Sequence, residues 1–175
     1  MHTLYFVRHG QSEANAAGIT AGCRIDAPLT EQGRHEAKLA AAQLAGLPID
    51  TVVSSPMVRA HQTARIIADD IDYAGEIHTN KLLVERDFGD ATGIRREGQL
   101  ANVDPHTPGL ESEQQLFERM KRALAWLKTV PGDHVLVTGH AGSGRMLQVV
   151  ANGGTVDDFA TYERLQNAHI YKMEL

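Results

Sequence analysis

Short β-rich apolar runs alternate along this chain with longer segments of helical spacing, and this alternation limits the possible folds more than any other feature. The runs at residues 3–8, 50–53 and 134–138 are predicted to be buried strands, and residues 76–84 form a weaker candidate. Because strands that alternate with helices are joined by crossover connections, the pattern predicts a mainly parallel sheet with helices on both faces. Residues 169–175 alternate between outward and inward positions, which predicts a half-buried strand near a sheet edge.

Capping residues mark where the expected helices begin and end. Thr30 is a candidate N-cap for a helix that Gly46 closes, and Ser55 is a candidate N-cap for a helix that runs to about residue 71. Ser112 and Gln115 have the spacing of a capping box at the start of a third helix. Between these elements the sequence predicts irregular structure.

Glycine-rich and polar segments supply those irregular parts. Residues 11–28 are expected to form a loop, and the stretch that ends at Gly109 is rich in glycine, proline and charge. A glycine-rich turn after residue 138 leads toward a helix around residues 146–150, and a last helix is expected to begin near Thr155.

Length and composition favour one globular domain over residues 1–175. The chain has 175 residues, of which 42% are hydrophobic, so it is long enough to bury one sizeable core. Its formal net charge of −5 is not gathered into runs, so neither nucleic acid nor a membrane surface is an expected partner. Cys23 is the one cysteine, which excludes an internal disulfide and favours a reducing, cytoplasmic location. The apolar residues 4–7 are too few for a signal peptide, so no targeting segment is expected.

Polar residues with a common chemistry follow three of the predicted strands. Ligands of α/β folds bind beyond the carboxyl ends of the strands, where such residues meet. These residues are Arg8-His9-Gly10, Ser54-Ser55-Pro56 with Arg59 shortly after, and Gly139-His140-Ala141-Gly142. If the three strands lie side by side, two histidines and two arginines converge on one pocket.

Such a pocket suits a phosphate monoester. Guanidinium groups bind two phosphate oxygens at once, and backbone amides at helix starts add further donors. A histidine buried beside arginines stays neutral, so its imidazole can attack phosphorus, while a second imidazole stabilises the developing charge. The leaving alkoxide needs a proton from a carboxylic acid, for which Glu85 is the first candidate and Asp87 the reserve.

Six segments together carry a resemblance to a known family. These segments are LYFVRHGQSEAN, DAPLTEQGRHEA, VVSSPMVRAHQTA, LLVERDFGDATG, PGLESEQQLFERM and VLVTGHAGSGRML. They span most of the chain and resemble, in this order, the motifs of the histidine phosphatase superfamily, also called phosphoglycerate mutase-like. The resemblance implies a three-layer α/β/α sandwich, with a mainly parallel sheet and an antiparallel C-terminal edge strand. It also implies that no metal and no cofactor is needed.

The resemblance also implies roles for individual residues. His9 is similar to the residue that becomes phosphorylated, Glu85 to the usual proton donor, and Asn15 to an asparagine that contacts the phosphate. Arg8, Arg59 and His140 complete the phosphate pocket by the same analogy. Ala141 stands where the family usually has glycine and would offer the same backbone amide. Gln11, Gly22 and Cys23 are further candidates for lining the pocket, or else ordinary loop residues.

The family contains both phosphatases and mutases, so the reaction has more than one interpretation. The segment DFGDATGIRREGQL lacks the His-Tyr-Gly element of the mutases, and the cap around residues 86–110 is short, which favours hydrolysis of a small phosphorylated substrate. A mutase, a phosphoprotein or phosphohistidine phosphatase, and a non-catalytic binder of phosphorylated ligands are the alternatives. Arg95 and Arg96 are candidates for binding an anionic substrate or are simply solvated.

Overall fold

The computed structural model describes residues 3–95 and 103–175, which contain a central five-stranded sheet of order β3-β2-β4-β1-β5. The strands are β1 (Thr3–Arg8), β2 (Thr51–Ser54), β3 (Ile77–Thr79), β4 (His134–Gly139) and β5 (Ile170–Glu174). The first four pair in parallel, and β5 runs antiparallel to β1 at one edge. This arrangement confirms the predicted α/β fold with its antiparallel C-terminal edge strand.

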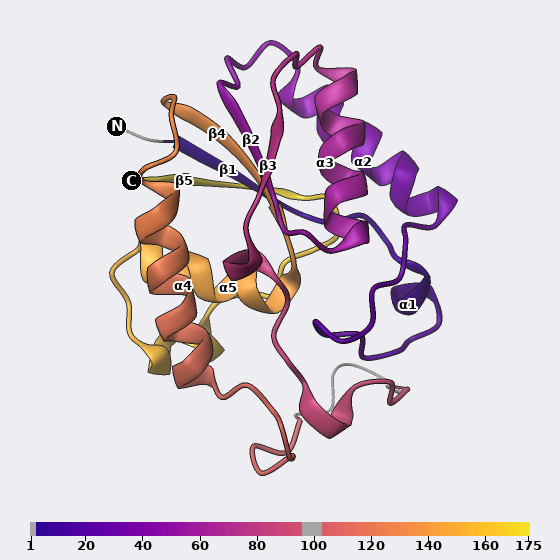
Figure 1. Cartoon of the computed structure of the whole chain (residues 1–175), viewed down its shortest axis with the longest axis vertical. Coiled ribbons are helices and arrows are strands. Elements are labelled where there is room, and N and C mark those ends of the chain that lie inside the picture. Colours follow the sequence, from indigo (N-terminus) through magenta and orange to yellow (C-terminus); the bar gives the residue numbers. More distant parts are fainter. Residues whose placement is uncertain (1–2, 96–102) are drawn as a thin grey trace.

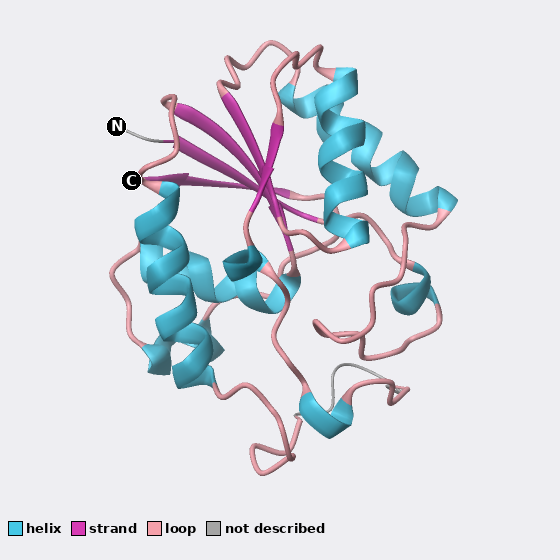
Figure 2. Ribbon diagram, viewed as in Figure 1, coloured by secondary structure: helices cyan, strands magenta, loops and turns pink. Residues whose placement is uncertain are grey.

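Helices cover both faces of the sheet and complete the three layers (Figure 1). On one face lie α2 (Glu31–Leu44) and α3 (Val58–Asp70), and on the other lie α4 (Glu113–Leu127) and α5 (Ala141–Ala151). The long connecting segments gather on one side of the sheet, around α1 (Glu13–Ala16) and the 3-10 helix η2 (Gly89–Ala91) (Figure 2). None of the described helices is both long and apolar enough to span a bilayer.

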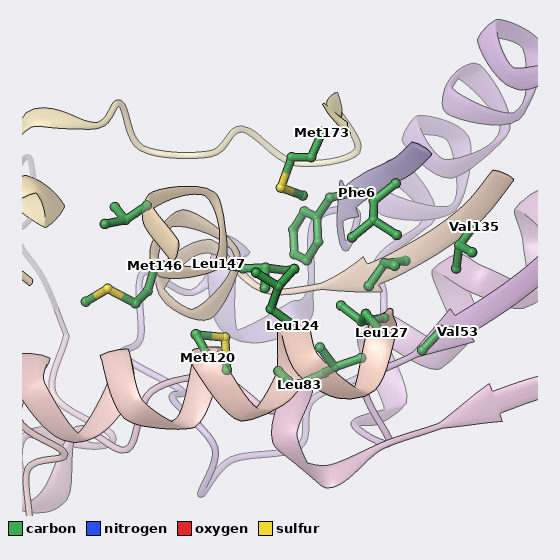
Figure 3. Packing of buried hydrophobic residues seen from close by; sticks show 14 of the residues in the cluster. Phe6, Val53, Leu83, Met120, Leu124, Leu127, Val135, Met146, Leu147 and Met173 are labelled. Atoms are coloured by element: carbon green, nitrogen blue, oxygen red, sulfur yellow. The ribbon is translucent and has the colours of Figure 1, made fainter. Parts of the chain in front are cut away.

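Two apolar clusters hold the layers together. Alternate residues of a strand face opposite sides, so Phe6 packs toward α4 and α5 while Tyr5 and Val7 pack toward α2 and α3. Figure 3 shows Phe6, Met120 and Leu147 among the side chains that fill the first of these layers. Burial of β1 on both faces explains why its sequence is a continuous apolar run rather than an alternating one.

Several elements differ in extent from the sequence predictions. The expected loop after β1 contains the short helix α1, which Ser12 caps. The expected strand at residues 76–84 is shorter, because the Asn80 side chain accepts a hydrogen bond from the Leu82 amide at 2.9 Å and starts the 3-10 helix η1 (Lys81–Leu83). The expected last helix is the 3-10 helix η3 (Val156–Thr161).

The starts of α3 and α5 were also predicted incorrectly. The N-cap of α3 is Met57, which makes no side-chain capping bond. Ser55 lies two residues earlier, and its Oγ accepts a hydrogen bond from the Met57 amide at 3.3 Å. α5 begins at Ala141, directly after β4, so the glycines that follow His140 lie inside its first turn.

The first turn of α2 presses against the loop that follows β1. A Cβ atom on Gly33 would lie 2.0 Å from the Gln11 carbonyl oxygen, and one on Gly10 would lie 2.2 Å from the Gly33 carbonyl oxygen. The Thr30 amide donates to the same Gln11 carbonyl at 3.0 Å, which fixes this approach. The backbone next to His9 is thus held by direct contact with a helix.

This contact makes Gly33 sensitive to substitution. We expect Gly33→Ala to lower the free energy of unfolding by about 2–3 kcal/mol, because the methyl group meets backbone that is itself fixed by hydrogen bonds. Urea denaturation of the variant measures the loss. Gly46→Ala is the matched control, since a Cβ there contacts nothing within 4 Å and only the positive φ of 83° opposes it, at a cost of about 1 kcal/mol. Equal losses of unfolding free energy in the two variants would contradict a close contact between Gly33 and the Gln11 backbone.

Candidate active site

The two predicted histidines meet because β1 and β4 pair in parallel. Arg8 lies opposite Gly139 in the register, and the His9 amide donates to the Gly139 carbonyl at 2.9 Å. The rings of His9 and His140 therefore lie edge to face, with centroids 5.2 Å apart. Both residues are buried, with exposed fractions of 3% and 0%.

The hydrogen bonds of His9 define which of its nitrogens carries a lone pair. Nδ1 lies 2.7 Å from the Gly10 carbonyl oxygen. A carbonyl only accepts, so Nδ1 must carry the proton and the neutral ring has its lone pair on Nε2. The Nε group of Arg59 donates to this Nε2 at 3.2 Å. His9 is thus oriented from both sides, with a nucleophilic nitrogen next to a guanidinium group.

Backbone carbonyls fix the guanidinium group of Arg59, which is 2% exposed. Its Nη1 donates to the Ile25 carbonyl at 2.9 Å, and its Nη2 donates to the Gly22 carbonyl at 2.8 Å. Because carbonyls bring no negative charge, they hold the side chain in place without neutralising it. Among the described residues, the Asp26 carboxylate lies 4.0 Å from its Nη1.

His140 is oriented by Ser55, whose Oγ lies 2.8 Å from Nε2. This serine was predicted as a helix cap, but its hydroxyl connects the end of β2 to the imidazole that follows β4. Oγ accepts from the Met57 amide and can donate its own hydrogen to Nε2, and in that arrangement the ring proton of His140 lies on Nδ1. Nδ1 is buried and has no hydrogen-bond partner among the described residues.

Both imidazoles are neutral at pH 7. Burial lowers the pKa of His9 well below its usual value, and the neighbouring His140, Arg59 and Arg8 lower it further. Burial and the charges of Arg59 and Arg8 likewise lower the pKa of His140. A neutral imidazole retains the lone pair that nucleophilic attack requires.

Glu85 lies at the N-terminus of α5 as a bound carboxylate. Its Oε1 accepts hydrogen bonds from the amides of Arg86 at 2.8 Å and Ser143 at 3.0 Å, and its Oε2 accepts one from the Gly142 amide at 3.0 Å. Burial alone would raise the pKa of Glu85, but these three amides and the charge of Arg59 lower it below its ordinary value. The side chain is therefore ionised at neutral pH.

Arg8 adds a second buried cation next to His9. Its Nη1 donates to the Leu165 carbonyl at 2.8 Å, whereas its Nε is buried without a partner among the described residues. Burial lowers the pKa of Arg8 to about 10, and the positive charge of Arg164 contributes to this shift. The guanidinium group stays protonated at neutral pH, and its Nε–H is available to donate a hydrogen bond to a ligand.

These side chains border one cavity of about 860 Å³ beyond the carboxyl ends of the strands. Its wall includes seven of the predicted site residues: Arg8, His9, Asn15, Gly22, Arg59, Glu85 and Ala141. His140 lies behind this wall, against His9. Eight of the predicted site residues thus lie together, seven at the cavity wall and His140 behind it.

Three predicted residues lie away from the cavity wall. The Oε1 of Gln11 accepts from the Thr30 hydroxyl at 2.8 Å, so this side chain points toward the start of α2. Cys23 is partly buried outside the wall, and burial raises the pKa of its thiol. Asp87, the reserve proton donor, binds Arg24 at 2.7 Å instead.

Of the two cap arginines that were candidates for binding an anionic substrate, one lies in the described part of the chain. Arg95 is exposed and does not line the cavity, and Arg96 lies outside the described residues. In residues 3–95 and 103–175, no group of three or more His, Cys, Asp or Glu side chains is close enough to hold a metal ion.

Arg145, Arg164 and Asn167 are among the polar residues of the wall that sequence reasoning missed. Arg145 follows Ala141 by four residues on α5, so helical periodicity would have placed it on the same face. Asn167 donates from Nδ2 to the His9 carbonyl at 2.7 Å. Like Arg164, it lies in an irregular segment before β5, where no periodic pattern predicts the direction of a side chain.

Comparisons with known proteins agree with the fold. Residues 4–175 match the family model of the histidine phosphatase superfamily (branch 1). A 2,3-bisphosphoglycerate-dependent phosphoglycerate mutase from Parvibaculum lavamentivorans is 34% identical over 164 residues, which cover 82% of this chain and 77% of the relative. The enzyme of the same name from Brucella ovis is also 34% identical, over 92% of this chain and 86% of the relative.

Solved structures share the fold at lower sequence identity. Mycobacterial glucosyl-3-phosphoglycerate phosphatase, in a complex with VO3, superposes with a TM-score of 0.86 at 23% identity, over 98% of this chain and 92% of that one. Phosphoserine phosphatase from Entamoeba histolytica superposes with a TM-score of 0.80 at 23% identity, over 98% and 90% of the two chains. With its motifs, its sheet and its family match in agreement, this chain belongs to branch 1 of the histidine phosphatase superfamily.

Proposed function

We propose that this protein is a phosphomonoester hydrolase that forms a phosphohistidine intermediate on His9. One observation carries the proposal: the lone pair of a neutral, buried imidazole lies beside two arginines at the wall of a cavity. A phosphate dianion between these arginines would place its phosphorus near Nε2, and the arginines would stabilise the charge on its oxygens.

The reaction would proceed in two displacements. In the first, the Nε2 lone pair forms a bond to phosphorus while the bond from phosphorus to the ester oxygen breaks, and the electron pair leaves with that oxygen. The leaving oxygen takes a proton from Glu85. In the second, water attacks the phosphohistidine and gives a proton to the Glu85 carboxylate, and the electron pair of the broken N–P bond returns to Nε2. Inorganic phosphate is released, and the neutral His9 and protonated Glu85 of the productive complex are restored.

Unsatisfied donors around His9 support this assignment. Arg8 Nε and His140 Nδ1 are both buried without a partner among the described residues, and a phosphate oxygen would satisfy each of them. Asn15 lines the cavity through an amide whose Oδ1 already accepts from the Ser12 amide at 3.2 Å, so Nδ2 is the group to offer to a substrate. Arg59 would exchange its contact with Nε2 for one with the phosphate.

The role of Glu85 requires a change of protonation when substrate binds. Its carboxylate is ionised in the free protein, so it must gain a proton before it donates one. A phosphate dianion beside it would raise its pKa by charge repulsion. Equivalently, the substrate would enter as a monoanion and share its proton with Glu85. In both cases the productive complex contains one proton more than a complex of the phosphate dianion with the ionised Glu85.

A mutase is the second candidate, because relatives that are 34% identical carry that name. Hydrolysis is favoured here by the absence of the His-Tyr-Gly element after Glu85.

We further propose a small phosphorylated molecule as the substrate, catalysis without a metal, and a cytoplasmic location. A cavity of about 860 Å³ lies within the range of small-ligand sites. Coupled assays that follow both free phosphate and phosphate relocation distinguish hydrolysis from the mutase reaction.

Replacement of the nucleophile tests the proposal directly. We expect His9→Ala to lower kcat for p-nitrophenyl phosphate by at least about 10⁴-fold, because no other side chain of the described residues is placed to attack phosphorus. Rapid quenching of the wild type with a ³²P-labelled substrate at chelator concentrations that remove divalent metals should trap label on His9. His35→Ala, at a histidine of α2 that does not line the cavity, is the control and should retain activity. Full turnover by His9→Ala, or label on another residue, would refute the mechanism.

A second prediction concerns the proton donor. We expect Glu85→Gln to lower kcat/KM for alkyl phosphates by about 10²- to 10⁴-fold, and for p-nitrophenyl phosphate by no more than about tenfold, because nitrophenolate leaves without a proton. A parallel series of aryl phosphates measures the dependence on the pKa of the leaving group. Asp87→Asn is the matched control, since this carboxylate is paired with Arg24. A larger effect of Asp87→Asn would make that residue the donor.

The pH dependence provides a third prediction. The pKa of Glu85 is lowered and the second pKa of a phosphate ester is about 6, so the complex with one shared proton is populated between these values. We expect kcat/KM for alkyl phosphates to fall about tenfold per pH unit above roughly pH 6. Because the pKa of His9 is also lowered, loss of the nucleophile by protonation should occur only below pH 6.5. A rate that rises up to pH 8 would be inconsistent with this scheme.

A further inference from the structure

The segment that leads into β5 lies across the backbone that follows β1. Because β5 runs antiparallel to β1, the residues before β5 are neighbours of the residues after β1. Val7 pairs with Ile170 at this end of the two strands. Residues 165–168 therefore lie beside His9, in the irregular segment between η3 and β5.

Three hydrogen bonds connect this segment to two consecutive residues. The Leu165 carbonyl accepts one from Nη1 of Arg8 at 2.8 Å, and the Ala168 amide donates one to the Arg8 carbonyl at 2.8 Å. Asn167 donates the third from Nδ2 to the His9 carbonyl at 2.7 Å. One short segment thus holds the side chain and the main chain of Arg8 and the main chain of His9.

The backbone of this segment is held in a strained conformation. Ala168 has a φ of 52°, in the left-handed region that a residue with a Cβ atom rarely adopts. Such a conformation persists where the surrounding structure determines it, and Ala168 is only 7% exposed and hydrogen-bonded through its amide. The Tyr171 hydroxyl also accepts a hydrogen bond from the Gln166 amide at 2.9 Å. These contacts keep the Asn167 side chain at the His9 carbonyl.

The peptide unit between His9 and Gly10 is held at both of its polar groups. Asn167 binds its carbonyl, and its amide donates to Oγ1 of Thr63 at 3.1 Å. Because a peptide unit is planar, bonds at its two opposite edges leave it little freedom to rotate. The His9 ring is in turn fixed by the next carbonyl, since Nδ1 donates to Gly10 at 2.7 Å. The direction of Nε2 therefore depends on the main chain that Asn167 holds.

We infer that Asn167 is a positioning residue, which aligns the His9 imidazole with phosphorus through its hydrogen bond to the His9 carbonyl. The inference deepens the proposed function and rests on it, because it assumes that His9 attacks phosphorus. In-line displacement requires the attacking lone pair and the leaving oxygen to lie on opposite sides of phosphorus. A small rotation of the ring therefore lowers the rate more than it weakens phosphate binding.

Replacement of the amide by an apolar group of similar shape tests this role. We expect Asn167→Leu to lower kcat for p-nitrophenyl phosphate by about 10- to 100-fold, the effect of a misalignment of about 1 Å. The inhibition constant for inorganic phosphate should change by less than about threefold, because both arginines beside His9 remain. Asn167→Gln keeps an amide donor and should recover part of the loss in kcat.

Gln166→Leu is the matched control for this substitution. It makes the same change from amide to leucine at an exposed neighbouring position outside the cavity wall, and it should retain the wild-type kcat. A kcat of Asn167→Leu within about threefold of the wild type, or an equal loss in Gln166→Leu, would overturn the inference. So would a rise in the phosphate inhibition constant as large as the fall in kcat. Asn167→Ala, which adds no bulk beside His9, repeats the test if the leucine variant does not fold.

A spectroscopic measurement separates this inference from the proposed function. The buried proton on Nδ1 of His9 should give a slowly exchanging NMR signal, identified by its absence from His9→Ala. We expect its exchange with water to be at least about tenfold faster in Asn167→Leu and unchanged in Gln166→Leu, because the ring is held less firmly only in the former. Faster exchange in Asn167→Leu, together with absence of turnover by the wild type, would refute the phosphatase and retain the positioning role. Turnover by the wild type, with neither faster exchange nor a lower kcat in Asn167→Leu, would do the reverse.

Discussion

The parallel pairing of β1 with β4 is the constraint on which the site depends. A one-residue shift of the register would turn alternate side chains to the opposite face of the sheet, so the apolar faces of both strands fix it. With that register the His9 amide donates to the Gly139 carbonyl. The residue that directly follows each of the two strands is a histidine. Burial of two apolar faces thus determines the 5.2 Å separation of two catalytic candidates that are 131 positions apart. The relative positions of the two histidines thus follow from packing of the core.

Neutral partners hold three of the arginines near the site. Backbone carbonyls hold Arg59 and Arg8, and the ring of Phe159 supports Arg145. A carboxylate in the same positions would fix the side chains equally well, but it would cancel the charge that is needed for an anionic ligand. Carbonyls and aromatic faces therefore supply geometry without neutralisation. Buried donors that remain unpaired, such as Nδ1 of His140, are a cost to stability that a bound anion removes.

The sequence predicted those parts of the molecule that follow from periodicity and from strand ends. Arg8, His9 and His140 were predictable because each ends or follows a buried strand, and parallel strands end at one edge of the sheet. Ser55 was misread as a helix cap, because serine before proline is compatible with both a cap and a turn. Arg164 lies in a segment without regular structure, so its position depends on tertiary packing that no local pattern contains. Predictability thus decreases from the sheet outward.

The amides at the start of α5 stabilise the Glu85 carboxylate, and the same amides would favour its protonation once a phosphate dianion binds nearby. In the free protein, the amides of Gly142 and Ser143 bind its carboxylate and keep it ionised, which satisfies donors that the first turn of α5 would otherwise leave unpaired. A phosphate dianion entering the cavity would be a second negative charge near the same amides and near Arg59. Since two adjacent anions cannot share these donors without repulsion, protonation of Glu85 relieves the conflict. The same contacts that stabilise the resting helix would therefore make the acid available only when a substrate is bound.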